Sequence, residues 1–455
     1  MIAPEEWGII ATAMIVLSIL GVIIDGGFGA ALIQRKQISR TDVSTVMYMN
    51  VALACIGFFF LLVAAKPIAV YFNQPDLTWI IPTLSITLLV ASFGQSQSQM
   101  LSKGLHFKLL AKLTIPSILS GGLVGITMAC FGFKAGALIG QQITINCVRT
   151  ILLWVVCPRE LQPNFGFSFS SFKKLAGFSF GVLGNSLLHR GTQNMTGLIV
   201  AKSFGAADLG FYNRARFFQQ APTTPLLRLL NRVLFPVFSE IQDDKTRLKS
   251  ALRTGIPIAI GCVAPLMFWL IATAEPLILV VLTDVWSEST QYLRVVPLMG
   301  ITLLLSGIKS NVIRSQGDGR LIFLLSLYRN AIILIGLLIT WRFGIMAMIV
   351  GQVVCYCMNM IVNDYFTQRY TGYTMVEQWM DWTPYILLSC FSALLALPIA
   401  WTSISSSLVV LILQSLVFAL AYGIGCKVLN LPIYQKVVGQ IRQRTFFNNL
   451  WQGSA

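Results

Sequence analysis

Charged residues are scarce in this sequence. They make up 11% of its 455 residues, whereas hydrophobic residues make up 56%, and the mean hydropathy is +0.74. Soluble domains carry about 25% charged residues, so this composition excludes a soluble globular protein. It predicts a membrane protein whose chain crosses the bilayer many times.

Residue types needed for active sites and metal sites are also few. His106 and His189 are the two histidines, and the nine cysteines form no CxxC pair. Zinc sites, catalytic triads and nucleotide-binding loops depend on such residues at fixed spacings. The longest expected outer loop, residues 272–292, is too short to carry a catalytic domain. We therefore expect no enzyme, no cofactor and no metal, and a membrane polysaccharide polymerase or ligase is kept only as a third alternative.

The excess of positive charge is not gathered in one patch. The 33 Lys and Arg residues outnumber the 17 Asp and Glu residues and give a net charge of +16. They are dispersed over many short loops, whereas a nucleic-acid-binding protein concentrates them on one face. We therefore expect no nucleic-acid partner.

Long apolar runs separated by short polar loops fill most of the chain. A run such as LVVLILQSLVFALAYGIGC is long enough for a transmembrane helix and lacks the alternation of a barrel strand. The predicted fold class is therefore all-α. We expect about thirteen spans, at residues 8–24, 46–65, 77–93, 114–131, 136–156, 175–200, 209–237, 254–271, 293–312, 321–340, 344–366, 382–401 and 407–426.

Charge alternates between the two sides of this series of spans. The basic segments are QRKQISR, SKGLHFKLLAK, PRELQPNFGFSFSSFKK, DDKTRLKSALR, the segment around Lys309, Arg314 and Arg320, and the tail KVLNLPIYQKVVGQIRQR. The intervening loops hold Lys66, Lys134, Lys202 and Arg342. By the positive-inside rule the basic side is cytoplasmic. This places the carboxyl terminus inside and the amino terminus outside.

Four short motifs occur twice along the chain. The pairs are PEEWG at Pro4 and AADLGFY at Ala206, AAKPIAVYF at Ala64 and TAEPLILVV at Thr273, SKG at Ser102 and SQG at Ser315, and FGFKAGALIGQ at Phe131 and FGIMAMIVGQ at Phe343. The offset stays between about 202 and 213 residues, which predicts a duplicated unit of six spans. The second unit begins with the span at Leu175, whose counterpart falls before Met1. We therefore expect the first helix of the first unit to be missing, and fourteen spans in a complete protein.

This duplication predicts four parts of the chain. Residues 1–160 form an amino-terminal bundle without its first helix, and residues 161–370 form a second bundle. Residues 371–430 form a final pair of helices, and residues 431–455 form a basic cytoplasmic tail.

Polar residues interrupt the span that begins at Leu175. A charged side chain at mid-bilayer costs about 2.5 to 3.5 kcal/mol, so such residues need a partner or a water-filled cavity. With 100° per residue, Ser186, Arg190, Gln193 and Gly197 fall on one face of the helix. We expect this stripe to face a cavity. The polar residues near the middle of the span are Asn185, His189, Arg190, Gln193 and Asn194.

The following apolar stretch carries four arginines. Arg214 and Arg216 lie near its outer end, and Arg228 and Arg232 near its inner end, where snorkelling to the interface is the alternative to a role in binding. Pro222 and Pro225 near its centre predict a broken or kinked helix.

Several of these stretches resemble one known family. APEEWG, DGGFGAALIQRK, LIVAKSFGAADLGFYNRA and RVLFPVFSEIQDD are similar to the polysaccharide transporter family of the multidrug/oligosaccharidyl-lipid/polysaccharide (MOP) flippase superfamily, which includes Wzx-type and colanic acid exporters. The resemblance covers nearly the whole chain. It implies two six-helix bundles and two further helices in the bacterial inner membrane. Because the family has a helix before its version of APEEWG, a natural truncation or a misassigned start is expected here.

The activity that the resemblance implies is that of a flippase. It would move an undecaprenyl-pyrophosphate-linked oligosaccharide to the periplasmic leaflet by alternating access, for exopolysaccharide, capsule or lipopolysaccharide O-antigen synthesis. Its partners would be this lipid-linked oligosaccharide, membrane lipids, a polysaccharide polymerase and other assembly proteins. A cation-coupled exporter of drugs or small molecules from the same superfamily is the alternative.

Candidate binding residues follow from the chemistry of this substrate. Arginine binds phosphate oxygens bidentately and keeps its proton, so we predict that Arg190 binds the pyrophosphate, with Arg214 and Arg216 as further candidates. A bridge from Arg190 to a neighbouring helix is the structural alternative. Candidate sugar-binding residues are Asn185, His189, Gln193, Asn194, Tyr212, Gln219 and Gln220.

Asp25 is the candidate residue for coupling to H⁺ or Na⁺. It follows the apolar run IIATAMIVLSILGVII and precedes GGFG, so it lies near the inner end of its span. The glycines after it leave a second interpretation open, in which Asp25 only caps a tight turn.

Overall fold

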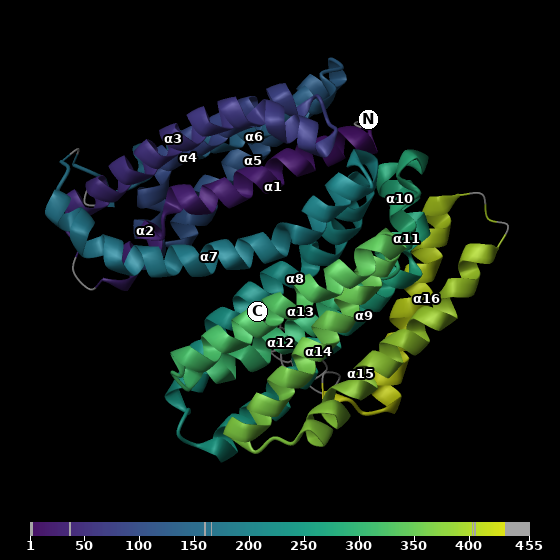
Figure 1. The fold of residues 1–455 in the computed structure, drawn as a ribbon. Coiled ribbons are helices and arrows are strands. Elements are labelled where there is room, and N and C mark those ends of the chain that lie inside the picture. The colour runs from purple at the N-terminus through teal and green to yellow at the C-terminus, as the bar shows by residue number, and fades with distance from the viewer. Residues whose placement is uncertain are drawn as a thin grey trace, which may run out of the picture. The chain divides into compact units, whose positions relative to one another are not determined.

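The computed structural model describes residues 3–35, 38–158, 161–164, 166–402, 404 and 406–432, and every regular element within them is a helix (Figure 1). The predicted all-α class is confirmed. Each expected span corresponds to a long helix. The elements are α1 (Pro4–Asp25), α2 (Phe28–Gln34), α3 (Arg40–Phe72), α4 (Leu77–Lys103), α5 (Phe107–Cys130), α6 (Lys134–Val156), α7 (Phe169–Ser203), α8 (Ala206–Glu240), α9 (Lys245–Ala272), α10 (Ala274–Leu282), η2 (Asp284–Trp286), α11 (Ser289–Leu293), α12 (Pro297–Ser315), α13 (Gly319–Thr340), η3 (Trp341–Phe343), α14 (Ile345–Thr371), α15 (Met375–Ala396), η4 (Leu397–Trp401) and α16 (Ser407–Val428).

Most of these helices can cross a membrane. Within the described part of the chain, 11 helical segments are long and apolar enough to do so. The helices α7 and α8, each 35 residues long, are not among them. Their polar and charged side chains lower the hydropathy that a span needs. These two helices contain the candidate binding residues. Within a membrane, their polar side chains need neighbouring protein or water.

Residues Met1–Gly210 form the first of two compact units. In it α3 packs against α4, α4 and α5 pack against α6, and α1 packs against α3, α4 and α7. The predicted boundary after residue 160 rests on the repeated sequence motifs. The two contact-based units do not test this boundary, so it stays a prediction.

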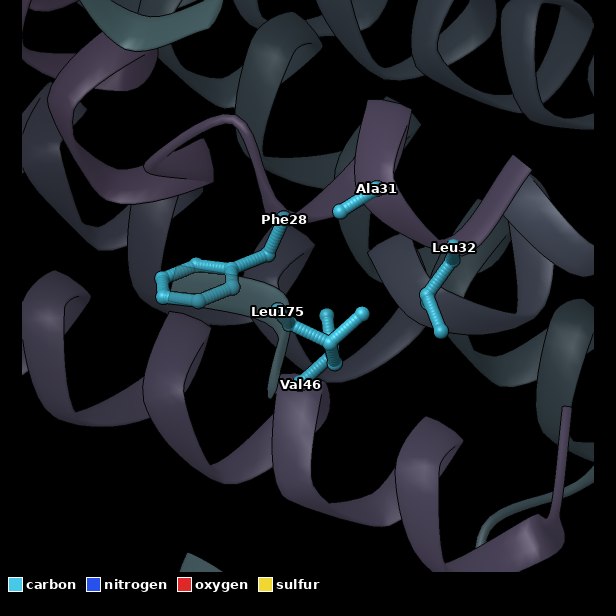
Figure 2. Packing of buried hydrophobic residues seen from close by; sticks show 5 residues of the cluster. All are labelled: Phe28, Ala31, Leu32, Val46 and Leu175. Atoms are coloured by element: carbon cyan, nitrogen blue, oxygen red, sulfur yellow. The ribbon is translucent and has the colours of Figure 1, made fainter. Parts of the chain in front are cut away.

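The short helix α2, which connects α1 to α3, fixes the amino-terminal part of α7. Phe28, Ala31 and Leu32 of α2 form a buried cluster with Val46 of α3 and Leu175 of α7 (Figure 2). Each of these side chains is at most 4% exposed. Burying them fastens α7 to α2 and α3, which leaves the rest of α7 to run along α1.

Residues Phe211–Ala455 form the second unit. In it α9 packs against α12 and α15, α14 against α12 and α13, and α15 against α16. The expected basic tail, residues 431–455, lies outside the described residues from position 433 onward.

Two of the repeated motifs have the same local structure at both copies. SKG and SQG lie at the ends of α4 and α12, and the FG dipeptides lie just before α6, with Phe133 in between, and directly before α14. In both FG pairs the glycine, Gly132 or Gly344, has a left-handed backbone with φ of 81° or 95°. A side chain would strain that conformation, so the motif repeats because the turn repeats.

Two details bear on the sequence-based expectations. Of the predicted break or kink at Pro222 and Pro225, the break is absent, since α8 continues through both prolines to Glu240, and the kink stays a prediction; helices in such proteins tolerate proline where other groups satisfy the freed carbonyls. Lys309 does not belong to a basic loop. It is fully buried within α12, where its ammonium group donates to Asp364 of α14, because an interior charge requires an opposite charge.

Candidate functional site

A large cavity lies inside the first unit, with walls from α1, α4, α6 and α7. Its volume is about 870 Å³, near the upper end of the roughly 300 to 1,000 Å³ of small-molecule sites. Two of its charged side chains have opposite sign, Arg190 and Asp25. The lining residues are Met14, Leu17, Ser18, Gly21, Val22, Asp25, Leu84, Thr87, Leu88, Gln95, Gln142, Ser186, His189, Arg190 and Gln193.

The wall contributed by α7 is the polar stripe expected from the sequence. Ser186, Arg190 and Gln193 all line the cavity, which confirms that this face of the helix points into it. His189 lies beside them, with its Nε2 atom 3.0 Å from Nε2 of Gln193. Arg190 is exposed, so its guanidinium group is available to a ligand. The role of these residues in binding stays a prediction.

The remaining polar positions of α7 lie elsewhere. Asn194 donates from Nδ2 to Oγ of Ser18 on α1 at 2.8 Å, so it fastens the two helices together. A Cβ atom on Gly197 would lie 2.6 Å from Cδ1 of Ile15, so Gly197 contacts α1 rather than continuing the stripe into the cavity. Asn185 is exposed and is not among the residues that line the cavity.

Asp25 forms the anionic end of the cavity wall. Its Oδ1 atom accepts hydrogen bonds from Nε2 of Gln95 at 2.5 Å and from Nε2 of Gln99 at 2.9 Å. Gly26, with φ of 56°, ends α1 directly after it. The glycines therefore form a turn directly after Asp25, and the role of this carboxylate in coupling stays a prediction.

Sequence reasoning did not select the polar residues of α4 and α6. The span expected at residues 77–93 stopped before the run GQSQSQ, whereas α4 continues to Lys103 and brings Gln95 to the cavity. Gln142 of α6 lines it as well. A block of alternating Gln and Ser directly after an apolar span is the signal that could have identified this wall.

The other predicted site residues belong to the second unit. Tyr212 is 1% exposed and donates to Oε1 of Gln352 at 3.4 Å. Gln219 is 2% exposed and donates to Oγ1 of Thr223 at 3.1 Å. Gln220 is exposed. The buried Tyr212 and Gln219 therefore have partners within the protein.

The two outer arginines differ in their surroundings. The guanidinium carbon of Arg214 lies 5.3 Å from the ring centre of Trp286 and 6.0 Å from that of Phe217, which are cation–π distances. Arg216 lies within electrostatic range of the Tyr356 hydroxyl. Two aromatic rings thus lie beside Arg214, and the role of both arginines in substrate binding stays a prediction.

Comparison with known protein families identifies the family to which this chain belongs. Residues 1–291 match the family model described as polysaccharide biosynthesis protein. The chain belongs to this family. The match covers both the cavity-forming helices and the start of the second unit.

Named relatives of the family come from several bacteria. The chain is 27% identical to the succinoglycan biosynthesis transport protein ExoT of Rhizobium meliloti over 72% of this chain and 66% of that protein. It is 28% identical to the teichuronic acid biosynthesis protein TuaB of Bacillus subtilis, over 66% and 62%. It is 25% identical to the lipopolysaccharide biosynthesis protein WzxC of Escherichia coli, over 66% and 61%. The aligned part thus spans less than two thirds of these three relatives.

Solved structures with the same architecture are transporters of the MOP superfamily. The lipid II flippase MurJ in an inward closed conformation has a TM-score of 0.73, with 13% identity and 94% of each chain covered. An inward-facing multidrug resistance MATE transporter has a TM-score of 0.64, with 14% identity over 81% of this chain and 91% of that chain. At these identities the likeness shows the fold. The predicted fold class, an all-α membrane protein of the MOP-flippase type, is confirmed.

Proposed function

We propose that this family member is a flippase that moves an undecaprenyl-pyrophosphate-linked oligosaccharide across the bacterial inner membrane, for synthesis of a cell-surface polysaccharide. The observation that carries the proposal is the cavity of about 870 Å³ with Arg190 on its wall, in a chain that belongs to a polysaccharide biosynthesis family. In this proposal the cavity opens to each side of the membrane in turn.

The chemistry of the cavity fits the two ends of such a head group. Arg190 supplies a permanent positive charge for the pyrophosphate. Gln193, His189, Ser18, Thr87 and Gln142 supply hydroxyl, amide and imidazole groups for the sugar hydroxyls. Apolar residues of α1 and α4 complete the wall, so the polar groups converge on a cavity that a sugar ring could occupy.

Asp25 is the proposed coupling residue. Its carboxylate lies on the same cavity wall and accepts from two glutamine side chains. Binding of H⁺ or Na⁺ at Asp25 would change the charge that faces a negatively charged substrate. Asparagine at this position keeps a hydrogen-bonding side chain and removes the charge, which makes Asp25→Asn the informative variant.

Transport in vesicles tests the function directly. Purified protein is reconstituted into liposomes with a fluorescent undecaprenyl-pyrophosphate-linked oligosaccharide in the outer leaflet, and its movement is followed by loss of accessibility to an added glycosidase. We expect protein-dependent movement, which an imposed proton or sodium gradient accelerates in the wild type and not in Asp25→Asn.

The result that overturns the proposal is equally specific. If the lipid-linked sugar does not move while organic cations leave the vesicles along the same gradients, the protein is a small-molecule exporter of the MOP superfamily. Vesicles with the Arg320→Gln variant serve as the control. This variant removes a positive charge outside the cavity, because Arg320 is an exposed residue at the start of α13.

A further inference from the structure

A smaller pocket adjoins the large cavity of the first unit. It lies between α4 and α6 and has a volume of about 220 Å³. Gln95 lines both this pocket and the large cavity, so the two spaces meet at this side chain. The volume is below the roughly 300 Å³ at which drug-sized sites begin. The pocket therefore has room for one sugar residue and not for a whole oligosaccharide.

Arg149 of α6 gives this pocket a positive charge. It lies seven residues before the end of α6 at Val156, which at 1.5 Å per residue is about 10 Å inside the span. A charged group at such a depth needs an opposite charge or a polar cavity. Within the described part of the chain Arg149 forms no ion pair, and its Nη2 atom donates to Oγ of Ser98 at 3.3 Å. The positive charge of Arg149 is therefore left for a ligand.

The carboxylate of Asp25 is hydrogen-bonded to two residues of the pocket wall but does not itself line the pocket. Gln95 and Gln99 both line the pocket, and both donate from Nε2 to Oδ1 of Asp25. Asp25 lines the large cavity instead, and none of the residues that line the smaller pocket is acidic. The negative charge thus belongs to the large cavity and the positive charge of Arg149 to the smaller pocket.

Neutral hydrogen-bond acceptors complete the wall of the pocket. Oε1 of Gln99 is buried and has no hydrogen-bond partner among the residues that the structure describes. Asn146 donates from Nδ2 to the carbonyl of Gln142 at 2.8 Å, and Thr150 donates to the carbonyl of Val90 at 3.1 Å. Both side chains line the pocket and keep an oxygen that can accept a hydrogen bond. Because a buried acceptor without a donor costs free energy, this wall favours a ligand with hydroxyl groups.

We propose that this pocket binds a sugar residue that carries a carboxylate, with Arg149 pairing with the carboxylate and the neutral wall accepting from the sugar hydroxyls. The planar guanidinium fork binds a carboxylate bidentately. A single arginine matches the single charge of a carboxylate, whereas a pyrophosphate carries more than one charge and has no hydroxyl to offer the acceptors. The inference rests on the proposed transport of a lipid-linked oligosaccharide, and it assigns an acidic sugar to that substrate.

Binding of two matched probes to the purified protein tests this pocket. Both probes are undecaprenyl-pyrophosphate-linked disaccharides, one ending in glucuronic acid and the other in glucose, so that they differ in one carboxylate. The affinity for each probe is measured in detergent by native mass spectrometry across a titration. Because the carboxylate adds charge-assisted hydrogen bonds, we expect the wild type to bind the acidic probe about tenfold or more tightly than the neutral probe.

Substitution of Arg149 should remove this preference for the acidic probe. Arg149→Gln loses the charge, so the ratio of the two affinities should fall to about one, whereas Arg149→Lys loses only the planar fork and should keep part of the preference. The matched control is Lys134→Gln, which removes the other positive charge of α6 at an exposed position that does not line the pocket. This control should keep the wild-type ratio.

Two results overturn the inference while leaving the proposed function intact. One is equal binding of both probes by the wild type, and the other is an equal loss of both in Arg149→Gln, which would assign Arg149 to the shared pyrophosphate. If Arg149→Gln fails to fold, as judged by gel filtration, Arg149→Lys decides, and an unchanged ratio there also overturns the inference. Failure of the proposed function is recognised separately, because neither probe then moves in the vesicle assay. If neither probe binds, both proposals are wrong.

Discussion

Arg190 is the residue on which the proposed substrate site depends most. It lies on the cavity-facing side of α7, beside Gln193 and His189. Its exposure within the first unit argues against the alternative in which it only bridges two helices. The neighbouring helix contact is made instead by Asn194, which donates to Ser18.

Substitution of Arg190 should weaken transport in a graded way. Arg190→Lys keeps the charge and loses the planar fork, whereas Arg190→Gln loses the charge, so Gln should be the more severe change. Loss of a charge-assisted hydrogen bond, worth about 1.5 to 3 kcal/mol, should lower substrate affinity by about ten- to a hundredfold. The measurement is the concentration dependence of flipping in vesicles at equal protein content. Wild-type affinity in Arg190→Gln would remove this residue from the site.

At the scale of helices, the amino-terminal ends of α1 and α8 cross at two glycines. A Cβ atom on Gly8 would lie 1.6 Å from the carbonyl oxygen of Ala206, and one on Gly210 would lie 2.1 Å from that of Pro4. Pro4 and Gly8 belong to PEEWG, and Ala206 and Gly210 to its repeat AADLG. Each copy of the motif thus supplies the glycine that the other copy packs against, as small residues do where membrane helices approach closely.

Alanine at either glycine should therefore destabilise the protein. The added methyl group meets backbone atoms that cannot rotate away, and overpacking of this kind costs about 1 to 3 kcal/mol. We expect Gly8→Ala and Gly210→Ala to lower the melting temperature in detergent. Gly177→Ala is the control, because a Cβ atom there meets nothing within 4 Å. Equal melting temperatures for all three variants would show that α1 and α8 do not pack closely at Gly8 and Gly210.

At the scale of the whole molecule, the distribution of basic residues predicts the orientation in the membrane. The exposed residue Ser250 lies near the start of α9, after a basic loop predicted to be cytoplasmic. The exposed residue Ser287 lies between η2 and α11 in a connection predicted to be outside. The two positions should therefore differ in their access to a reagent that does not cross the membrane.

Cysteine labelling of intact cells checks this orientation. After replacement of the native cysteines, two of which, Cys130 and Cys262, are exposed, Ser287→Cys should react with an impermeant maleimide. Ser250→Cys should react only after the membrane is permeabilised. The opposite pattern would reverse the assignment of the two sides.

The sequence by itself determined the helices and the class of fold. Apolar runs of membrane length depend on local composition, so α1, α3 and α16 could be placed without tertiary contacts. The repeated FG turn was also visible locally, because only glycine adopts its backbone readily. The same periodicity placed Ser186, Arg190 and Gln193 on one face of α7, which the cavity confirms.

Only the tertiary structure decided which polar groups meet. Asp25 is 70 residues from Gln95, and Lys309 is 55 residues from Asp364, so no local pattern links these partners. The polar run GQSQSQ lies beyond the predicted end of its span. In the structure, packing of α4 against α1 and α6 places Gln95 of this run on the cavity wall. The physical reason is that periodicity gives the direction of a side chain within its own helix, whereas its partner depends on the register and depth of neighbouring helices, which packing sets.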